Sequence, residues 1–231
     1  MSQLKAIGLT QAEIDERAFI SQVYLWMATA LVVTAVVAAM VANDIAFVAQ
    51  MVTSGLIWVF FIGEIALVIA LGALINRLSA PAATTLFFGY AALNGVTLSL
   101  IFLAYTDASI AATFLVTAAT FGAMSAYGYL TKRDLTAIGN FLVMGLIGFL
   151  IASVVNLFLR SEGIYWITTY AGILIFIGLT AYDTQKIKRM ASGGIAESEV
   201  ARKASILGAL RLYLDFINLF LLLLRLLGRR R

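Results

Sequence analysis

The sequence predicts an all-α membrane protein with seven transmembrane helices in a single transmembrane domain, residues 1–231. Hydrophobic residues make up 62% of the chain and charged residues only 12%, which is about half the charged fraction of a soluble domain. The mean hydropathy is +0.99. The apolar residues form continuous runs of the roughly 20 residues that a transmembrane helix needs. The strands of a membrane β-barrel would instead show alternating segments of about ten residues.

The predicted spans follow a polar segment, residues 1–20, which mixes acidic and basic side chains. A signal peptide would show a basic start and a short apolar run, so we expect the first span to stay in the mature protein. The turn Thr106–Ser109 separates the third span from the fourth, whereas the long loop Thr184–Ile206 separates the sixth from the seventh. The spans are Ser21–Ala42, Ser54–Ile75, Ala83–Tyr105, Ile110–Leu130, Gly139–Leu159, Ile164–Asp183 and Leu207–Leu227.

The chain contains no cysteine and no histidine. A disulfide framework and a thiolate metal site are therefore excluded, as are a histidine pH switch and a Ser-His catalytic pair. Any proton chemistry must use carboxylates. We expect the formal net charge of +4 to orient the protein in the membrane rather than to bind nucleic acid.

Lysine and arginine predict the orientation, because cytoplasmic loops carry an excess of both. Alternate segments hold ten basic residues, whereas the loops between them hold Arg160 beside acidic residues, which places the N-terminus in the cytoplasm. The basic tail Arg229–Arg231 does not fit this rule, because seven crossings would place it outside the cytoplasm. Either the last apolar stretch re-enters without crossing, or the earlier loops already fix the orientation; we favour a full crossing. The ten residues are Lys5, Arg17, Arg77, Lys132, Arg133, Lys186, Lys188, Arg189, Arg202 and Lys203, and the acidic residues opposite are Asp44, Asp107 and Glu162.

Ionisable residues inside spans indicate function, because each costs about 2.5 kcal/mol or more to insert. Arg211, Asp215, Asn218 and Arg225 of the seventh span fall within an arc of about 80° on a helix. Such a polar stripe cannot face lipid, so we expect this helix to be the least exposed to lipid. Alternatively, Arg211 and Asp215 simply neutralise each other four residues apart.

Two further acidic residues lie in the second and sixth spans. We predict that Glu64 faces the interior, either protonated or paired with an arginine such as Arg225; the alternative is a neutral acid bonded to a backbone carbonyl. Asp183 ends the sixth span, and the opposite directions of the spans place Asp183 and Asp215 in the same half of the membrane. Asp183 is alternatively an interfacial residue balanced by Lys186.

Two motifs resemble the Bax inhibitor-1 family of membrane proteins, in its bacterial type. They are the run Ala-Tyr-Asp-Thr-Gln-Lys-Ile ending at Ile187 and the run Leu-Tyr-Leu-Asp-Phe-Ile-Asn-Leu-Phe ending at Phe220. Gly63-Glu64, the polar start and the seven spans fit as well, so the resemblance covers nearly the whole chain. It implies a fold in which the last helix is central and wrapped by the other six.

The resemblance also implies a function, that of a pH-sensitive calcium leak channel in a bacterial inner membrane. The aspartate pair of the family falls on Asp183 and Asp215. An arginine that latches the pair in relatives falls on Ile75 here, and the nearest arginine is Arg77. The expected partners are the bilayer, protons and calcium as the permeant ion, without any cofactor. Calcium prefers six to eight oxygens, so two aspartates would bind it weakly.

Two other functions compete with the channel. An intramembrane aspartyl protease would need Gly-x-Gly-Asp and Pro-Ala-Leu motifs; here Asp215 follows Tyr213-Leu214, and Pro81 is followed by two alanines. We therefore expect no enzyme. A regulator that binds a membrane protease or another membrane partner is the stronger alternative. Its docking surface would be the loop Thr184–Ile206, which contains Glu197 and Glu199, unless that loop is only a solvated linker.

Overall fold

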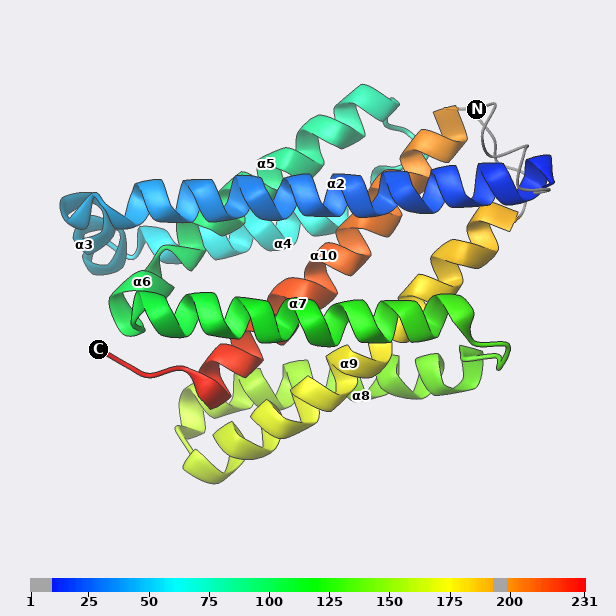
Figure 1. Ribbon diagram of the computed structural model, residues 1–231. Helices are drawn as coiled ribbons and strands as arrows, with labels where there is room; N and C mark the ends of the chain where they lie inside the picture. The colour runs from blue at the N-terminus through cyan, green and yellow to red at the C-terminus, as the bar shows by residue number, and fades with distance from the viewer. Residues whose placement is uncertain (1–9, 193–198) are drawn as a thin grey trace. The chain divides into compact units, whose positions relative to one another are not determined.

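The computed structural model describes residues 10–192 and 199–231, and these are almost entirely helical (Figure 1). Lys5 and Glu197 lie outside the described residues. Among the residues described, seven helices are long and apolar enough to cross a membrane, as the sequence predicted. They are α2 (Gln11–Ala42), α4 (Leu56–Leu74), α5 with α6 (Ala80–Leu98 and Leu100–Ala104), α7 (Asp107–Leu130), α8 (Thr136–Leu159), α9 (Glu162–Ser192) and α10 (Glu199–Leu227).

Several helix ends differ from the predicted spans. Helix α2 begins at Gln11, because Thr10 and Glu13 form a capping box that satisfies its first backbone N–H groups. A short helix, α3 (Ile45–Thr53), follows α2 and is capped by Asp44. The prediction of a loop over Thr184–Ile206 is wrong for most of these residues, since α9 continues to Ser192 and α10 starts at Glu199. Apolar content marks where a helix leaves the membrane, and these helices continue beyond that level.

The chain forms two compact units, and α9 and α10 contribute to both. The first contains α2 to α6, the end of α9 and the start of α10. Its α2 packs against α5, which also packs against α4 (Figure 1). At Gly95 the two helices are so close that an added Cβ would lie 2.7 Å from the carbonyl oxygen of Thr34. Tyr213 of α10 meets the rings of Phe87 and Tyr90 edge-on.

The second unit contains α7, α8, most of α9 and the end of α10. Gly128 of α7 and Gly139 of α8 both lie directly against α9, at Ala181 and at the ring of Tyr182. From α10, Phe216 contacts two aromatic rings of α7, Phe114 and Phe121. The glycines let α7 and α8 approach α9 closely, so this part of α9 is held on two sides.

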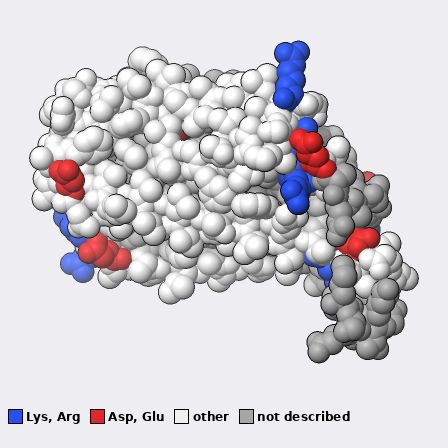
Figure 2. Space-filling view, turned by 90° about the horizontal axis from the view of Figure 1, so that it is seen from above, with Lys and Arg blue, Asp and Glu red and all other residues white. Residues whose placement is uncertain are grey.

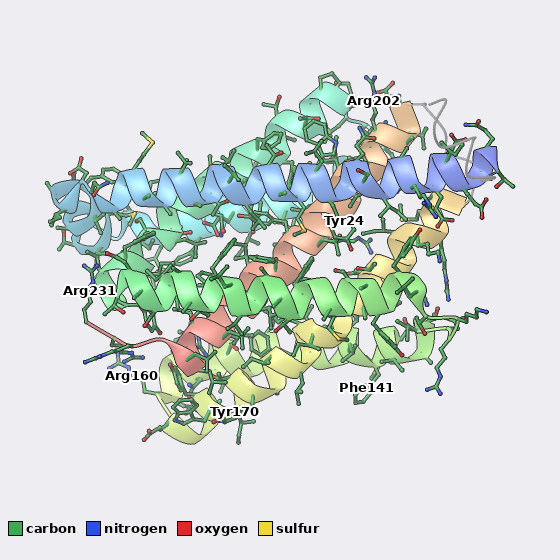
Figure 3. The ribbon with its side chains drawn as sticks, viewed as in Figure 1. Tyr24, Phe141, Arg160, Tyr170, Arg202 and Arg231 are labelled. Carbon is green, nitrogen blue, oxygen red and sulfur yellow. The ribbon has the colours of Figure 1, made fainter. Side chains whose placement is uncertain are left out.

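Burial differs strongly between the helices. Of the most apolar window of α10, 72% is buried, against at most 44% in any other span, which fits a last helix with little exposure to lipid. The corresponding window of α8 is 0% buried, and its residue Phe141, labelled in Figure 3, is 72% exposed. On the described part of the face in Figure 2, charged side chains form small groups and uncharged residues cover the surface between them. The central place of α10 stays a prediction.

Candidate functional site

Asp215 lies inside α10 and is only 4% exposed. Asp183 is half-buried in α9. Both belong to the second unit. Insertion of a carboxylate into a membrane costs free energy that partners or a proton must offset. Burial of Asp215 agrees with the expectation that it faces the protein interior, and its functional role stays a prediction.

Two contacts fix the alignment of α9 with α10. Gly172 lies against Leu222, and Ile187 lies against Gly208, so the helices run antiparallel. Counted from either contact, Asp183 lies level with residue 211 or 212. It is then three or four residues from the level of Asp215, or roughly 4.5 to 6 Å along the axis. This is an offset along the helix axis and not a distance between the two carboxylates, so their contact, direct or through one water, stays a prediction.

The four residues of the polar stripe have different environments. Asp215 is buried, Asn218 and Arg225 are half-buried, and Arg211 is exposed. Exposure of Arg211 does not show that it faces lipid, so the expectation that the stripe avoids lipid stays a prediction. Arg211 lies only one turn inside the predicted start of the span, where a long side chain can extend toward the interface. The amide of Asn218 donates to the carbonyl of Leu214 at 2.8 Å.

Glu64 faces the interior of the first unit and is 8% exposed. Its carboxyl group has two partners on α5: the Thr97 hydroxyl lies 2.6 Å from Oε1, and the Asn94 amide donates to Oε2 at 3.2 Å. Its partners are side chains, rather than the backbone carbonyl of the alternative interpretation. Arg225 belongs to the second unit, so its pairing with Glu64 stays a prediction.

The polar cluster around Glu64 continues across the unit. The Tyr213 hydroxyl lies 3.0 Å from Oδ1 of Asn94 and 2.6 Å from the hydroxyl of Thr34. Thr34 in turn lies 2.8 Å from the carbonyl oxygen of Ala91. Four helices, α2, α4, α5 and α10, are therefore joined by one buried network, whose members Glu64, Asn94, Thr97, Thr34 and Tyr213 are each less than a tenth exposed.

Sequence reasoning missed the partners of Glu64. Asn94 gave a usable signal, because an asparagine inside a span is costly unless its amide is bonded. The threonines gave little, since many threonines in spans only bond their own helix, as Thr117 does with the carbonyl of Thr113. Tyr213 lies within one of the two family motifs, but nothing in the sequence links its hydroxyl to Asn94.

The predicted latch and metal roles have little structural support. Arg77 is exposed in the segment between α4 and α5, in the first unit, whereas the two aspartates lie in the second. The latch therefore stays a prediction. Within residues 10–192 and 199–231, no group of three or more acidic, histidine or cysteine side chains is placed to hold a metal ion. A calcium ion at Asp183 and Asp215 would thus keep much of its water.

Seven apolar helices that carry a buried aspartate and a buried glutamate network define a multi-pass α-helical membrane protein. The chain belongs to the family described as "Inhibitor of apoptosis-promoting Bax1", whose profile matches residues 16–231. This is the Bax inhibitor-1 family that the two motifs indicated.

Two relatives show how far the similarity extends. The chain is 52% identical over 226 residues to "Inner membrane protein YbhL" of Escherichia coli (strain K12), and the match covers 97% of each chain. It is 42% identical over 229 residues to a protein of Borreliella burgdorferi, with 97% of this chain and 99% of the other covered.

Proposed function

We propose that this protein is a pH-sensitive calcium leak channel gated by Asp183 and Asp215. The observation that carries the proposal is the burial of Asp215 inside α10, only 4% exposed, near the level of Asp183 on the adjacent helix. The name of the Escherichia coli relative supports a bacterial inner membrane as its location. The proposed channel function involves no enzyme activity and no cofactor.

The pair would act through a shared proton. Two close carboxylates cannot both ionise cheaply, so they titrate as one unit. With one shared proton the pair ties α9 to α10 and closes the path. If the pair gains a second proton or loses its only one, the link between α9 and α10 changes and the two helices can separate. Calcium and protons compete for the same oxygens, so calcium flux depends on pH where the pair titrates.

Calcium flux into liposomes that contain only the purified protein tests this mechanism. Asp183→Asn and Asp215→Asn keep the size and hydrogen bonding of each side chain but remove the coupled titration. We expect each variant to flatten the dependence of flux on pH, measured from about pH 5 to pH 8. The double variant should add little, because the two residues act as one unit.

Asp44→Asn is the matched control, since it removes one carboxylate from the exposed cap of α3 and asparagine caps a helix equally well. It should keep the parent's pH profile. The mechanism is wrong if the Asp183 and Asp215 variants also keep that profile. Absence of any flux from the purified parent would favour the alternative, a regulator that acts only with a membrane partner. Because α9 continues to Ser192 and α10 starts at Glu199, less of the predicted docking loop Thr184–Ile206 is available to such a partner as a loop.

A further inference from the structure

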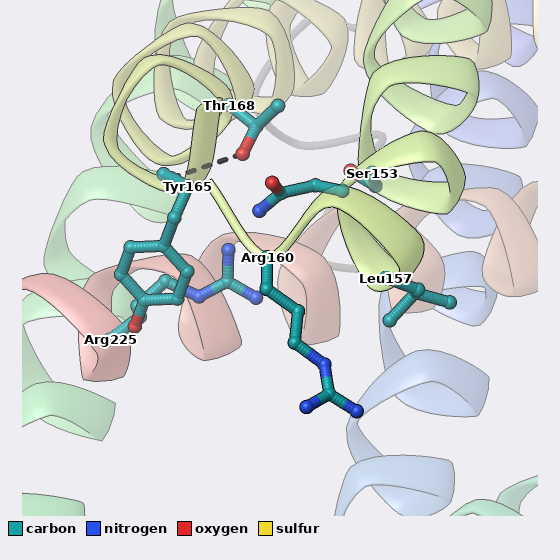
Figure 4. Close-up of a pocket in the computed structure, with 7 residues that line it drawn as sticks. Ser153, Leu157, Arg160, Tyr165, Thr168 and Arg225 are labelled. Atoms are coloured by element: carbon teal, nitrogen blue, oxygen red, sulfur yellow. Dashed lines mark hydrogen bonds between the residues drawn. The ribbon is translucent and has the colours of Figure 1, made fainter. Parts of the chain in front are cut away.

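A cavity of about 430 Å³ lies in the second unit, at the end of α8 and the start of α9 (Figure 4). It is separate from the polar network of Glu64, which belongs to the first unit. Three helices and the connection between α8 and α9 contribute side chains to it. The residues that line it are Ser153, Asn156, Leu157, Arg160, Tyr165, Thr168 and Arg225.

The charged residues of this lining are two arginines, and no acidic residue is among them. The side-chain oxygen of Asn156 accepts from the backbone N–H of Ser161 at 2.8 Å, which leaves the amide N–H groups to donate elsewhere. Guanidinium groups and an amide together form a site for an anion, because they supply positive charge and several donors. Glu162, the first residue of α9, is exposed and does not line the cavity.

Arg225 is a half-buried cation whose described contacts are neutral. Its guanidinium lies over the ring of Tyr165, 4.6 Å from the centroid, and 3.4 Å from the hydroxyl of Thr169. Tyr165 also lies 3.5 Å from the guanidinium of Arg230 in the tail. A guanidinium in a membrane span usually pairs with an acidic side chain or with backbone carbonyls. At this cavity the anion can come from outside the chain.

Arg160 has a strained backbone at the edge of the cavity. It caps the C-terminus of α8 with φ 50° and ψ 33°, and it is the non-glycine residue with positive φ in the described chain. Glycine would take this conformation without strain. Strain that a protein retains often marks a functional position, and here an arginine is retained at a cavity that a second arginine also lines.

The residues around the cavity are of the kinds expected at the depth of lipid headgroups. Trp166 and Tyr170 stack on each other on α9 and are 36% and 53% exposed, as in the aromatic belts at membrane interfaces. On α8, Leu157 and Phe158 are 61% and 82% exposed. An acyl chain can lie along this apolar surface while its phosphate enters the cavity.

A second cavity, of about 320 Å³ in the first unit, lacks this combination. Its lining contains one arginine, Arg202, labelled in Figure 3. The carboxylate of Glu199 accepts from the backbone N–H of Ala80, another lining residue. An acidic group is therefore already present beside that cavity.

From these observations we infer that the cavity between Arg160 and Arg225 binds the phosphate headgroup of an anionic phospholipid. The Arg225 guanidinium and the Asn156 amide donate to the phosphate oxygens, and Arg160, whose side chain extends away from them in Figure 4, turns toward the headgroup when it binds. The basic tail, which disagreed with the charge rule for orientation, then lies at the same lipid surface as this site. This inference does not depend on channel activity.

Native mass spectrometry of the purified protein tests the site, with phosphatidylglycerol, phosphatidylcholine and inorganic phosphate as separate probes. We expect the parent to prefer phosphatidylglycerol over phosphatidylcholine. Arg160→Gln and Arg225→Gln should each reduce that preference by about tenfold, the usual effect of one lost charge-assisted hydrogen bond. Arg133→Gln, an exposed arginine in the same unit, should leave it unchanged.

Arg160→Gly separates binding from folding. It relieves the strained backbone, so its unfolding midpoint without lipid should rise, while the preference for phosphatidylglycerol should fall. Equal binding of the two lipids by the parent, or an unchanged preference in the three cavity variants, would overturn the inference. Binding of inorganic phosphate as tight as that of phosphatidylglycerol would overturn the assignment to a lipid.

Discussion

The hydrogens around Glu64 indicate the protonation state of its carboxyl group. The Thr97 hydroxyl has one hydrogen but lies near two acceptors, Oε1 of Glu64 at 2.6 Å and the carbonyl oxygen of Asn94 at 2.9 Å. If Glu64 is protonated, it can donate to Thr97, and Thr97 can then donate to the carbonyl of Asn94. An ionised Glu64 would leave one of these contacts without a hydrogen. The geometry therefore fits a neutral acid.

A pair of substitutions tests that conclusion. Glu64→Gln keeps a donor and an acceptor at the same position, so stability in mild detergent should change little. Glu64→Leu leaves Asn94 and Thr97 without partners in a buried place, which should cost about 1–3 kcal/mol. The unfolding midpoint measures both. A large loss in Glu64→Gln would show that the negative charge itself is needed.

At this scale the sequence predicted the burial of Glu64 and Asp215 but not the partners of Glu64. An acid inside an apolar run can be recognised from composition, because the cost of inserting it is the same in any fold. The meeting of Tyr213 with Asn94 depends on how α5 and α10 align, and that alignment comes from packing between residues far apart in the chain.

Among the helices, two glycines that look alike in sequence have different roles. Both belong to pairs of small residues four apart, Ala91/Gly95 and Gly122/Ala126, and such pairs arise by chance in a chain rich in alanine and glycine. A Cβ at Gly95 would lie 2.7 Å from the Thr34 carbonyl oxygen and 2.8 Å from Cβ of Val37, whereas a Cβ at Gly122 would meet nothing within 4 Å.

Gly95→Ala should therefore destabilise the protein by about 1–3 kcal/mol, because α2 and α5 must move apart. Gly122→Ala is the matched change in open space and should be neutral or stabilising by up to about 1 kcal/mol, since alanine favours helix. Unfolding midpoints of the two variants in the same detergent compare them. Equal effects would show that the close approach of α2 and α5 does not contribute to stability.

The helices themselves followed from apolar runs, whereas their ends did not. All seven predicted spans correspond to helices. The continuation of α9 past Asp183 and the early start of α10 were missed, although buried residues such as Ile187 and Ile206 extend the packing there. Helix α3 was missed because its nine residues are too few to span a membrane.

For the molecule as a whole, the distribution of charge connects orientation with the two proposals. The channel requires Asp183 and Asp215 in the cytoplasmic half, near the basic residues that follow Asp183. The lipid site requires Arg160 and the tail at the opposite surface. Both locations follow from an N-terminus in the cytoplasm and an odd number of crossings.

Labelling of single cysteines tests this orientation directly, because the chain has no cysteine of its own. Lys132→Cys, Glu162→Cys and Arg231→Cys each change an exposed residue, in the α7–α8 connection, at the start of α9 and in the tail. With the outer membrane permeabilised, a membrane-impermeant maleimide should label positions 162 and 231 in intact cells. Position 132 should react only after the inner membrane is broken, because Lys132 belongs to the basic residues that are expected in the cytoplasm.

Labelling of position 132 in intact cells, with protection of position 162, would show that the protein has the opposite orientation. Protection of 231 together with labelling of 162 would show instead that α10 re-enters the membrane without crossing it, and the tail could then not share a surface with Arg160.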